Sequence, residues 1–170
     1  MNHDLDTTDR HILRLLQKDA RISNHDLAAA VGLSDTPCAR RVKRLEEEGY
    51  IVGQVALLDP DKLGLKLTAL VSVSMDRHTP ERFESFEKSV ARMPEVLECS
   101  LVTGQSADFV LKVVVSDMHH YERFLLGQLT KTPGVSGVHS SFVLRRIRST
   151  TALPVDGEDR PEPRRGAKKR

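Results

Sequence analysis

The chain has 170 residues and a mass of 19.0 kDa, which suits one medium domain or two small ones. Hydrophobic residues make up 39% and charged residues 29%, so a core can form, and no apolar run approaches the roughly 20 residues of a membrane span. The polar, acidic start is unlike a secretory signal peptide, and two cysteines are too few for a disulfide scaffold. These features predict a cytoplasmic globular protein with no membrane partner.

The formal net charge is only +2, from 26 basic and 24 acidic residues. The stretch 155–170 contains six of the basic and four of the acidic residues, so the rest of the chain is neutral. A case for a polyanionic partner must therefore rest on local clusters of charge. The tail, 154–170, is rich in Pro, Gly and charge and is predicted to be disordered. Its role is either solubility or a non-specific attraction to nucleic acid.

Residues 1–52 read as three short helices. Asp6 can cap the first helix, and Ser23 can cap the second. Gly32 is placed to end the second helix in the left-handed region, and Ser34 follows almost at once as a cap for the third. Two helices joined by a short turn that contains glycine are typical of a helix-turn-helix.

The third helix has two different sides. Cys38, Val42 and Leu45 recur at helical spacing and form an apolar side. A different side carries Thr36, Arg40 and Lys43 at the same spacing, with Arg41 and Arg44 beside them. Such a helix fits the DNA major groove, where arginine pairs with guanine or phosphate, and its N-terminus suits a backbone phosphate. The candidate DNA-binding residues are Ser34, Asp35, Thr36, Pro37, Arg40, Arg41, Lys43 and Arg44. The alternative is a solvated face with intrahelical Arg–Glu pairs.

Residues 50–58 are β-branched and aliphatic, which predicts a short strand or wing that runs into a linker at 53–66. Residues 67–153 then alternate between strand and helix patterns. The expected strands are 68–75, 96–103, 108–115 and 135–147, and a turn joins the second and third as a hairpin. The first expected helix begins at Thr79 and runs to Pro94. The second begins at Ser116 or Asp117 and includes Leu129. The resulting order, βαββαβ, is the ferredoxin-like arrangement.

The third of these strands is apolar on both sides, with Val110 and Val114 alternating with larger core residues. Two helices can cover only one face of the sheet. The sequence therefore predicts a homodimer in which two sheets pack face to face, about 10 Å apart.

The long stretch ISNHDLAAAVGLSDTPCARRVKRLEEEGYIVGQVALLDPDKLG combines the capped helices, the glycine turn and the basic helix in one pattern. This stretch resembles the N-terminal domain of the Lrp/AsnC family of transcription regulators, and the resemblance continues through MPEVLECSLVTG and SSFVLRRIRSTTALP. It covers residues 4–154. It implies an α+β protein, with an N-terminal winged helix-turn-helix followed by a ferredoxin-like effector and oligomerisation domain.

The resemblance also implies function. Family members are nucleoid-associated regulators that form dimers and often octamers, and they respond to small effectors, usually amino acids, bound between dimers. The effector residues that it implies are Val102, Thr103, Gly104, Asp108, Ser140, Ser141 and Phe142. Asp108 could accept a ligand ammonium group, or it could satisfy amide groups of its own turn. Three residues separate Gly104 from Asp108, where the family commonly has two.

Other chemistry finds little support in the sequence. The seven histidines lack metal-binding spacings, and Cys38 and Cys99 read as packed core thiols. Walker A, G-x-S-x-G and G-x-G-x-x-G motifs are absent, so no enzyme, metal or cofactor is expected. The sequence predicts a transcription regulator of double-stranded DNA with a small-molecule effector. The alternative is a ferredoxin-like small-molecule-binding regulatory protein without direct DNA readout.

Overall fold

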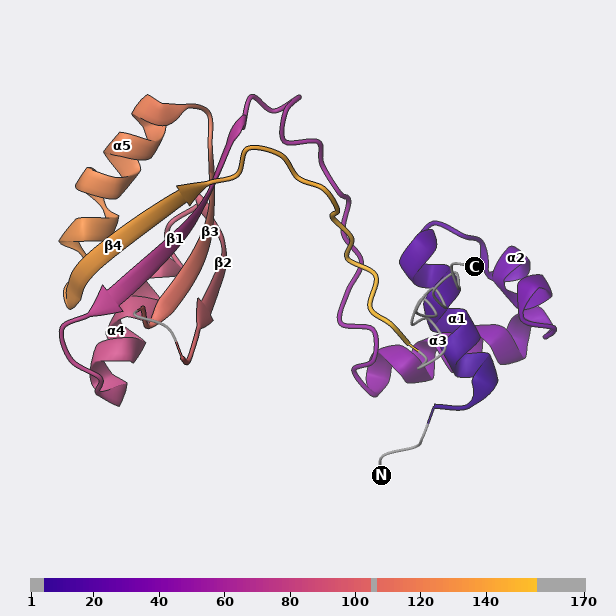
Figure 1. Ribbon diagram of the computed structural model, residues 1–170. Helices are drawn as coiled ribbons and strands as arrows, with labels where there is room; N and C mark the ends of the chain where they lie inside the picture. Colours follow the sequence, from indigo (N-terminus) through magenta and orange to yellow (C-terminus); the bar gives the residue numbers. More distant parts are fainter. Residues whose placement is uncertain (1–4, 105–106, 156–170) are drawn as a thin grey trace, which may run out of the picture. The chain divides into compact units, whose positions relative to one another are not determined.

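Figure 1 shows the computed structural model, which describes residues 5–104 and 107–155. The chain divides into two compact units. The first contains residues 5–56 together with the returning segment 148–155, and the second contains residues 57–147. The tail predicted to be disordered lies outside the described residues, apart from its first two positions.

The first unit contains the three expected helices. They are α1 (Thr7–Lys18), α2 (Asn24–Ala30) and α3 (Asp35–Glu47). Asp6 and Asp9 form a reciprocal capping box at α1, and the Ser23 hydroxyl accepts a hydrogen bond from the Asp26 amide at α2. Gly32 has a φ of 71°, so α2 ends in the left-handed conformation that the sequence predicted.

The core of this unit is small and draws on all three helices. Its buried hydrophobic residues are Ile12, Leu27, Ala28, Cys38 and Leu45. The predicted apolar side of the third helix is therefore confirmed for Cys38 and Leu45, and Val42 packs half-buried against the same cluster. This packing fixes which side of α3 faces inward and leaves the other side for solvent or a ligand.

Two local expectations about this unit are wrong. Residues 51–58 form no strand, and Val52 is 97% exposed, because an extended segment needs a neighbouring strand and none pairs with it in the single chain. Ser34 occupies the N-cap position of α3, but its side chain makes no capping hydrogen bond. Its hydroxyl is therefore not used to cap the helix.

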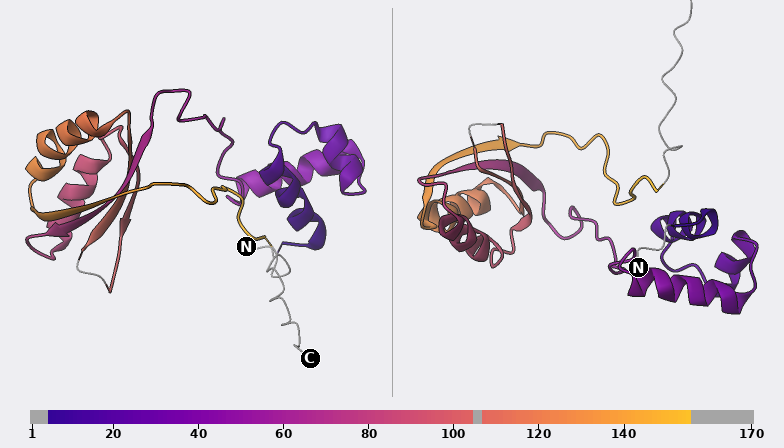
Figure 2. Two further views of the ribbon diagram at one scale, coloured as in Figure 1. Left: turned by 45° about the horizontal axis from the view of Figure 1, so that its top comes forward. Right: turned by 90° about the horizontal axis from the view of Figure 1, so that it is seen from below.

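The second unit is a four-stranded antiparallel sheet with helices on one face, as Figures 1 and 2 show. In chain order its elements are β1 (Leu67–Met75), α4 (Pro80–Val90), β2 (Val96–Leu101), β3 (Phe109–Val115), α5 (Met118–Gly127), the 3-10 turn η1 (Leu129–Lys131) and β4 (Val135–Phe142). The strand order in the sheet is β2-β3-β1-β4, so β3 and β1 are central. This arrangement confirms the ferredoxin-like fold.

Several element ends differ from the sequence prediction, including that of β2, which ends at Leu101 and not at Thr103. Helix α4 ends at Val90 and not at Pro94, and Leu129 lies in the 3-10 turn after α5. Strand β4 ends at Phe142 and not near Ile147. Phe142 pairs with Ala69, close to the start of β1, so the chain beyond Phe142 soon runs past the end of its partner strand. Leu144 is 99% exposed in the extension, because a strand without a partner has no ladder to join.

The open face of the sheet, which the helices do not cover, is less apolar than predicted. Leu70, Val110 and Val114 lie on it as expected. Lys112 lies between the two valines, where its Nζ contacts the Glu98 carboxylate at 2.5 Å. The face therefore combines aliphatic surface with an ion pair, and serines of β1 add further polar groups.

Candidate nucleic-acid interface and effector site

The four basic residues of α3 divide into two pairs with different surroundings. Arg40 and Lys43 are exposed on the side of the helix that faces away from the core. Lys43 Nζ lies 3.5 Å from a carboxylate oxygen of Glu47 one turn later, and Arg40 has no carboxylate partner among the described residues. An exposed pair of this kind contributes little to stability, so these two cations are available to an external anion.

Arg41 and Arg44 point toward α1. The Arg41 Nη1 atom donates to Asp6 Oδ2 at 2.6 Å and to Asp9 Oδ1 at 2.8 Å. The Arg44 Nη2 atom donates to Asp9 Oδ2 at 2.5 Å. These bonds raise the pKa of the Arg41 guanidinium and stabilise the contact between the two helices.

The Asp9 carboxylate is the centre of this network and is only 1% exposed. Sequence reasoning identified it neither as a buried residue nor as a partner of α3. Its buried charge requires compensation, which the two arginines and the Asp6 amide at 3.3 Å provide. The spacing of aspartates at the start of α1 could have suggested a capping box, but not the pairing between helices.

The start of α3 places the remaining candidate residues at the helix-turn-helix turn. Ser34, Asp35 and Thr36 are exposed, and Pro37 is half-buried in the first turn. The Asp35 carboxylate lies 3.3 Å from Nδ1 of His25 in α2, and its backbone carbonyl accepts a bond from the Asn24 side chain. These contacts connect α2 to the first turn of α3 and fix the geometry of the turn.

The candidate effector turn joins β2 and β3. The Val102 amide donates to the Asp108 carbonyl at 2.9 Å, and Thr103 and Gly104 continue the turn, with Gly104 at a φ of 80°. Gln105 and Ser106 lie outside the described residues. The turn is therefore closed at its base by the strand ladder, as the hairpin prediction requires.

The Asp108 carboxylate is already engaged by its own chain. Its Oδ2 accepts a hydrogen bond from the Met75 amide at 2.7 Å, and its Oδ1 lies 2.8 Å from Nε2 of His78. The ring of His78 in turn makes an edge contact with Phe83. An ammonium group that binds Asp108 must therefore displace or join the exposed His78 side chain.

The β4 residues of the predicted effector site lie elsewhere in the same chain. Ser140 is hydrogen bonded to the Tyr121 hydroxyl, and Phe142 packs edge-on against the same ring. Phe142 pairs with Ala69, whereas the Asp108 amide bonds to the Val73 carbonyl. Four residues of β1 separate these points, about 13 Å along the strand. One chain therefore does not bring the two groups together.

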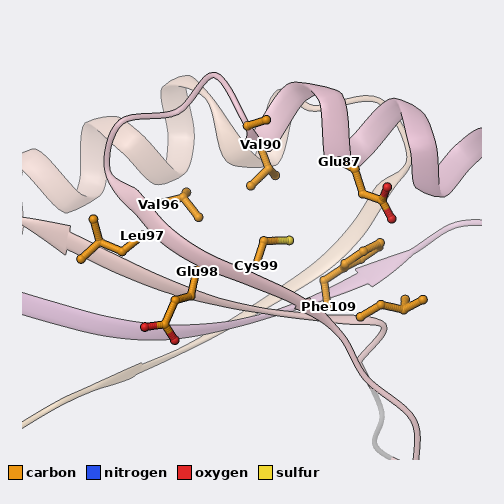
Figure 3. Close-up of a pocket in the computed structure, with 9 residues that line it drawn as sticks. Glu87, Val90, Val96, Leu97, Glu98, Cys99 and Phe109 are labelled. Atoms are coloured by element: carbon orange, nitrogen blue, oxygen red, sulfur yellow. The ribbon is translucent and has the colours of Figure 1, made fainter. Parts of the chain in front are cut away.

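Sequence reasoning missed a pocket of about 350 Å³ between α4 and β2. Figure 3 shows the Cys99 thiol directed into this space, toward Val90 and Phe109. Burial, followed by the nearby Glu87 charge, raises the pKa of this thiol. The prediction that Cys99 is a packed core thiol is wrong, because its strand lies at the sheet edge and the side chain is exposed at the pocket.

Sequence reasoning also missed the contact between the returning segment and α1. The Gln17 side chain donates to the Leu153 carbonyl at 3.1 Å and accepts from the Leu153 amide at 2.6 Å. The Arg10 guanidinium donates to the Val155 carbonyl at 2.9 Å. The first unit is thus built from both ends of the described chain.

The described part of the chain contains neither a metal-binding cluster nor a membrane-spanning helix. No three His, Cys, Asp or Glu side chains gather closely enough to bind a metal ion there. None of the helices described here is long and apolar enough to cross a membrane.

Comparison with known proteins matches both units. Residues 5–52 match a winged helix-turn-helix DNA-binding model, and residues 68–153 match the Lrp/AsnC ligand binding domain. The chain is 44% identical over 152 residues to the DNA-binding transcriptional activator DecR of Escherichia coli K12, covering 89% of this chain and 99% of DecR. It is 42% identical to the leucine-responsive regulatory protein of the same strain, covering 89% and 92%.

A solved structure agrees with these matches. A transcriptional regulator of Neisseria meningitidis, crystallised as a complex with L-Met, has a TM-score of 0.85 and 41% identity. The match covers 89% of this chain and 97% of that one. With a family match over half of its length and relatives above 40% identity, this chain belongs to the Lrp/AsnC family of transcriptional regulators.

Proposed function

We propose that the chain binds double-stranded DNA in a sequence-specific manner by inserting the exposed side of α3 into the major groove. The observation that carries this proposal is the exposure of Arg40 and Lys43 on a helix whose other sides face the core and α1. Arginine pairs with guanine, and both residues can contact phosphates. Such binding would associate the protein with the nucleoid.

The first turn of α3 is suited to hold the DNA backbone. The Ser34 hydroxyl makes no capping bond, and Thr36 is exposed beside it. Hydroxyl groups and free amides at a helix N-terminus are ordinary phosphate ligands. The Asp35 carboxylate opposes a phosphate at this point, and it is turned toward the His25 ring of α2 at 3.3 Å. The expected role of this turn is to set the orientation of α3 in the groove.

The test is the salt dependence of DNA affinity, measured by fluorescence anisotropy with a duplex selected from a random library. Arg40→Met and Lys43→Met should each weaken binding and reduce the slope of log K against log salt by about 0.9 for every phosphate that the protein no longer neutralises. Lys88→Met is the matched control, because Lys88 forms the same type of exposed i,i+4 pair with Glu84 in the other unit.

A wild-type affinity and slope in the double variant Arg40→Met/Lys43→Met would contradict the proposal. It would favour a ferredoxin-like small-molecule-binding protein without direct DNA readout. A slope reduced equally by Lys88→Met would show that net charge, and not the surface of α3, controls the affinity.

We propose further that the β2–β3 turn binds an amino acid as effector. The Asp108 carboxylate would accept its ammonium group, and the amides of Val102 to Gly104 would donate to its carboxylate. Relatives support this ligand class, since one is named as leucine-responsive and another was solved with L-Met. The bound ligand would favour one assembly of the protein over another, and such coupling typically amounts to about 1–3 kcal/mol.

The distance between Asp108 and Phe142 within one chain indicates how this site would be completed. Ser140, Ser141 and Phe142 would come from a neighbouring subunit, so that the ligand binds between subunits. The open sheet face would form the dimer, about 10 Å from its copy, and dimers would associate further, for example into octamers. The ion pair of Lys112 with Glu98 would lie within that dimer interface.

Calorimetry with L-leucine and L-methionine tests the ligand site. Asp108→Asn should abolish binding of either ligand, whereas His78→Gln should tighten it, because the competing imidazole is removed from Asp108. Unchanged binding in Asp108→Asn would remove this residue from the site. Light scattering tests the dimer: Val110→Asp on the open face should yield monomers, and Leu126→Asp on the helix side should not.

A further inference from the structure

The contact between α1 and α3 bears on how the helix reads DNA. Asp9 engages both arginines that lie next to the proposed reading side, at 2.8 Å for Arg41 and 2.5 Å for Arg44. The carboxylate is buried, whereas the two arginine side chains remain 30% and 37% exposed. The arginines therefore lie at the surface but are directed away from solvent by a buried anion.

All four cations border the same hollow. A cavity of about 520 Å³ on α3 is lined by Arg40, Arg41, Lys43, Arg44 and Glu47. A phosphate that enters this hollow could meet any of the four. Without Asp9, the guanidinium group of Arg44 would have no carboxylate to hold it, and rotation about its flexible stem would bring it to the phosphate, whereas Arg41 would keep its bond to Asp6.

The strength of the competition favours Asp9. A phosphate can attract Arg44 only by leaving a buried carboxylate short of a partner, and an uncompensated buried charge is costly. The buried Nε of Arg44, which has no hydrogen-bond partner among the described residues, also shows that its stem is packed and not extended into solvent. Arg40 and Lys43 face no such restraint.

We propose that Asp9 is a positioning residue of the DNA-binding domain. It holds Arg41 and Arg44 on α1, so that of the four cations only Arg40 and Lys43 meet the DNA. This inference rests on the proposed DNA binding through α3. Its consequence is a lower electrostatic affinity for any duplex, because phosphate contacts contribute to binding on any DNA.

The first test compares single arginine variants in the full chain. Arg44→Met keeps the aliphatic stem, and Asp9 retains Arg41, so no buried charge is left unpaired. Its salt slope should equal that of the wild type, and the same result is expected for Arg41→Met. Arg40→Met should lower the slope by about 0.9. If a variant only reduced the fraction of folded protein, the amount of active protein would fall, but the slope of log K against log salt would not change.

The outcomes separate the two proposals. If Arg44→Met and Arg41→Met lower the slope as much as Arg40→Met, the arginines contact DNA and the inference about Asp9 is wrong. If none of the three variants changes the slope, the proposed interface on α3 itself fails.

The second test releases the arginines. Asp9→Asn removes the charge at nearly constant volume and should steepen the salt slope by about 0.9 for each arginine that reaches a phosphate. Affinity for a random duplex should rise roughly five- to tenfold at 0.1 M salt for one such contact, and affinity for the selected duplex should rise by a similar factor. Adding Arg44→Met to Asp9→Asn should reverse most of the change.

A slope in folded Asp9→Asn that matches the wild type would contradict the proposal. Circular dichroism at the assay temperature establishes whether this variant is folded. If it is not, the single arginine variants decide the question, since each leaves Asp9 with a charged partner.

Discussion

The two candidate sites differ in how far their charged groups are satisfied by the chain itself. On α3, two cations share the buried carboxylate of Asp9, and two remain exposed to an external anion. At the β2–β3 turn, both oxygens of Asp108 are engaged, one by the Met75 amide and one by His78. A charged side chain at the position that a motif predicts is therefore available to a ligand only where the chain itself does not already pair it.

The largest expected effect comes from breaking the network at Asp9. Asp9→Ala should destabilise the first unit by about 3–5 kcal/mol, because two arginines lose a buried counter-charge. Urea unfolding followed by circular dichroism measures this destabilisation. A change below about 1 kcal/mol would show that the carboxylate contributes little to holding α3 against α1, and the contrast between the two sites would disappear.

Asp108→Ala should have a smaller effect on stability. It leaves the Met75 amide without its acceptor, which costs about 1–3 kcal/mol, while removal of the exposed pair with His78 adds little. The same unfolding measurement, made on the second unit's transition, checks this. A destabilisation as large as that of Asp9→Ala would mean that Asp108 is primarily a structural residue and that its loss of ligand response reflects unfolding.

Acid should weaken the α1 cap. The Asp9 amide, followed by Arg41, holds the pKa of the Asp6 carboxyl below its ordinary value. A lowered folded-state pKa means that the contribution of Asp6 is present above the ordinary pKa of about 3.9 and is lost as the pH falls through the folded value. The stability gap between wild type and Asp6→Asn should therefore be largest at neutral pH and should shrink as the pH falls below the ordinary pKa of about 3.9. A gap independent of pH would contradict this assignment.

The two cysteines should give the smallest effect, a difference in reactivity between the units. Burial, then Asp35, raises the pKa of the Cys38 thiol, which lies in the core of the first unit. Cys99 also has a raised pKa but is exposed at the pocket between α4 and β2. Alkylation of the native protein should modify Cys99 slowly, faster as pH rises, and Cys38 only after unfolding. Equal rates at the two positions would show that the first unit opens readily.

The sequence predicted most of the fold because local signals agreed with tertiary packing. Asp6, Ser23 and Gly32 mark helix ends by chemistry that acts within a few residues, and alternation along β1 and β3 reports a buried face directly. The strand predicted at 50–58 failed for the opposite reason. Its residues have strand propensity, but a strand also needs a partner, which propensity does not supply.

The sites were harder to predict because charge pairing depends on residues far apart in the sequence. The Asp9–Arg44 pair joins residues 35 positions apart, and Gln17 meets Leu153 across 136 positions. Helical spacing placed Arg40 and Lys43 on one side correctly, but it could not show that an aspartate of another helix faces Arg41. The distance of Phe142 from Asp108 likewise follows from strand register, which alternation alone does not fix.

Directed DNA cleavage would show whether the exposed side of α3 lies in the major groove. An iron chelate that cuts DNA would be attached at Arg40→Cys in a Cys99→Ser background, where the buried Cys38 stays unlabelled. We expect cleavage confined to a few base pairs at the centre of each half-site, and none from a chelate attached at Lys88→Cys. Undiminished DNA binding without cleavage from position 40 would contradict this placement of α3.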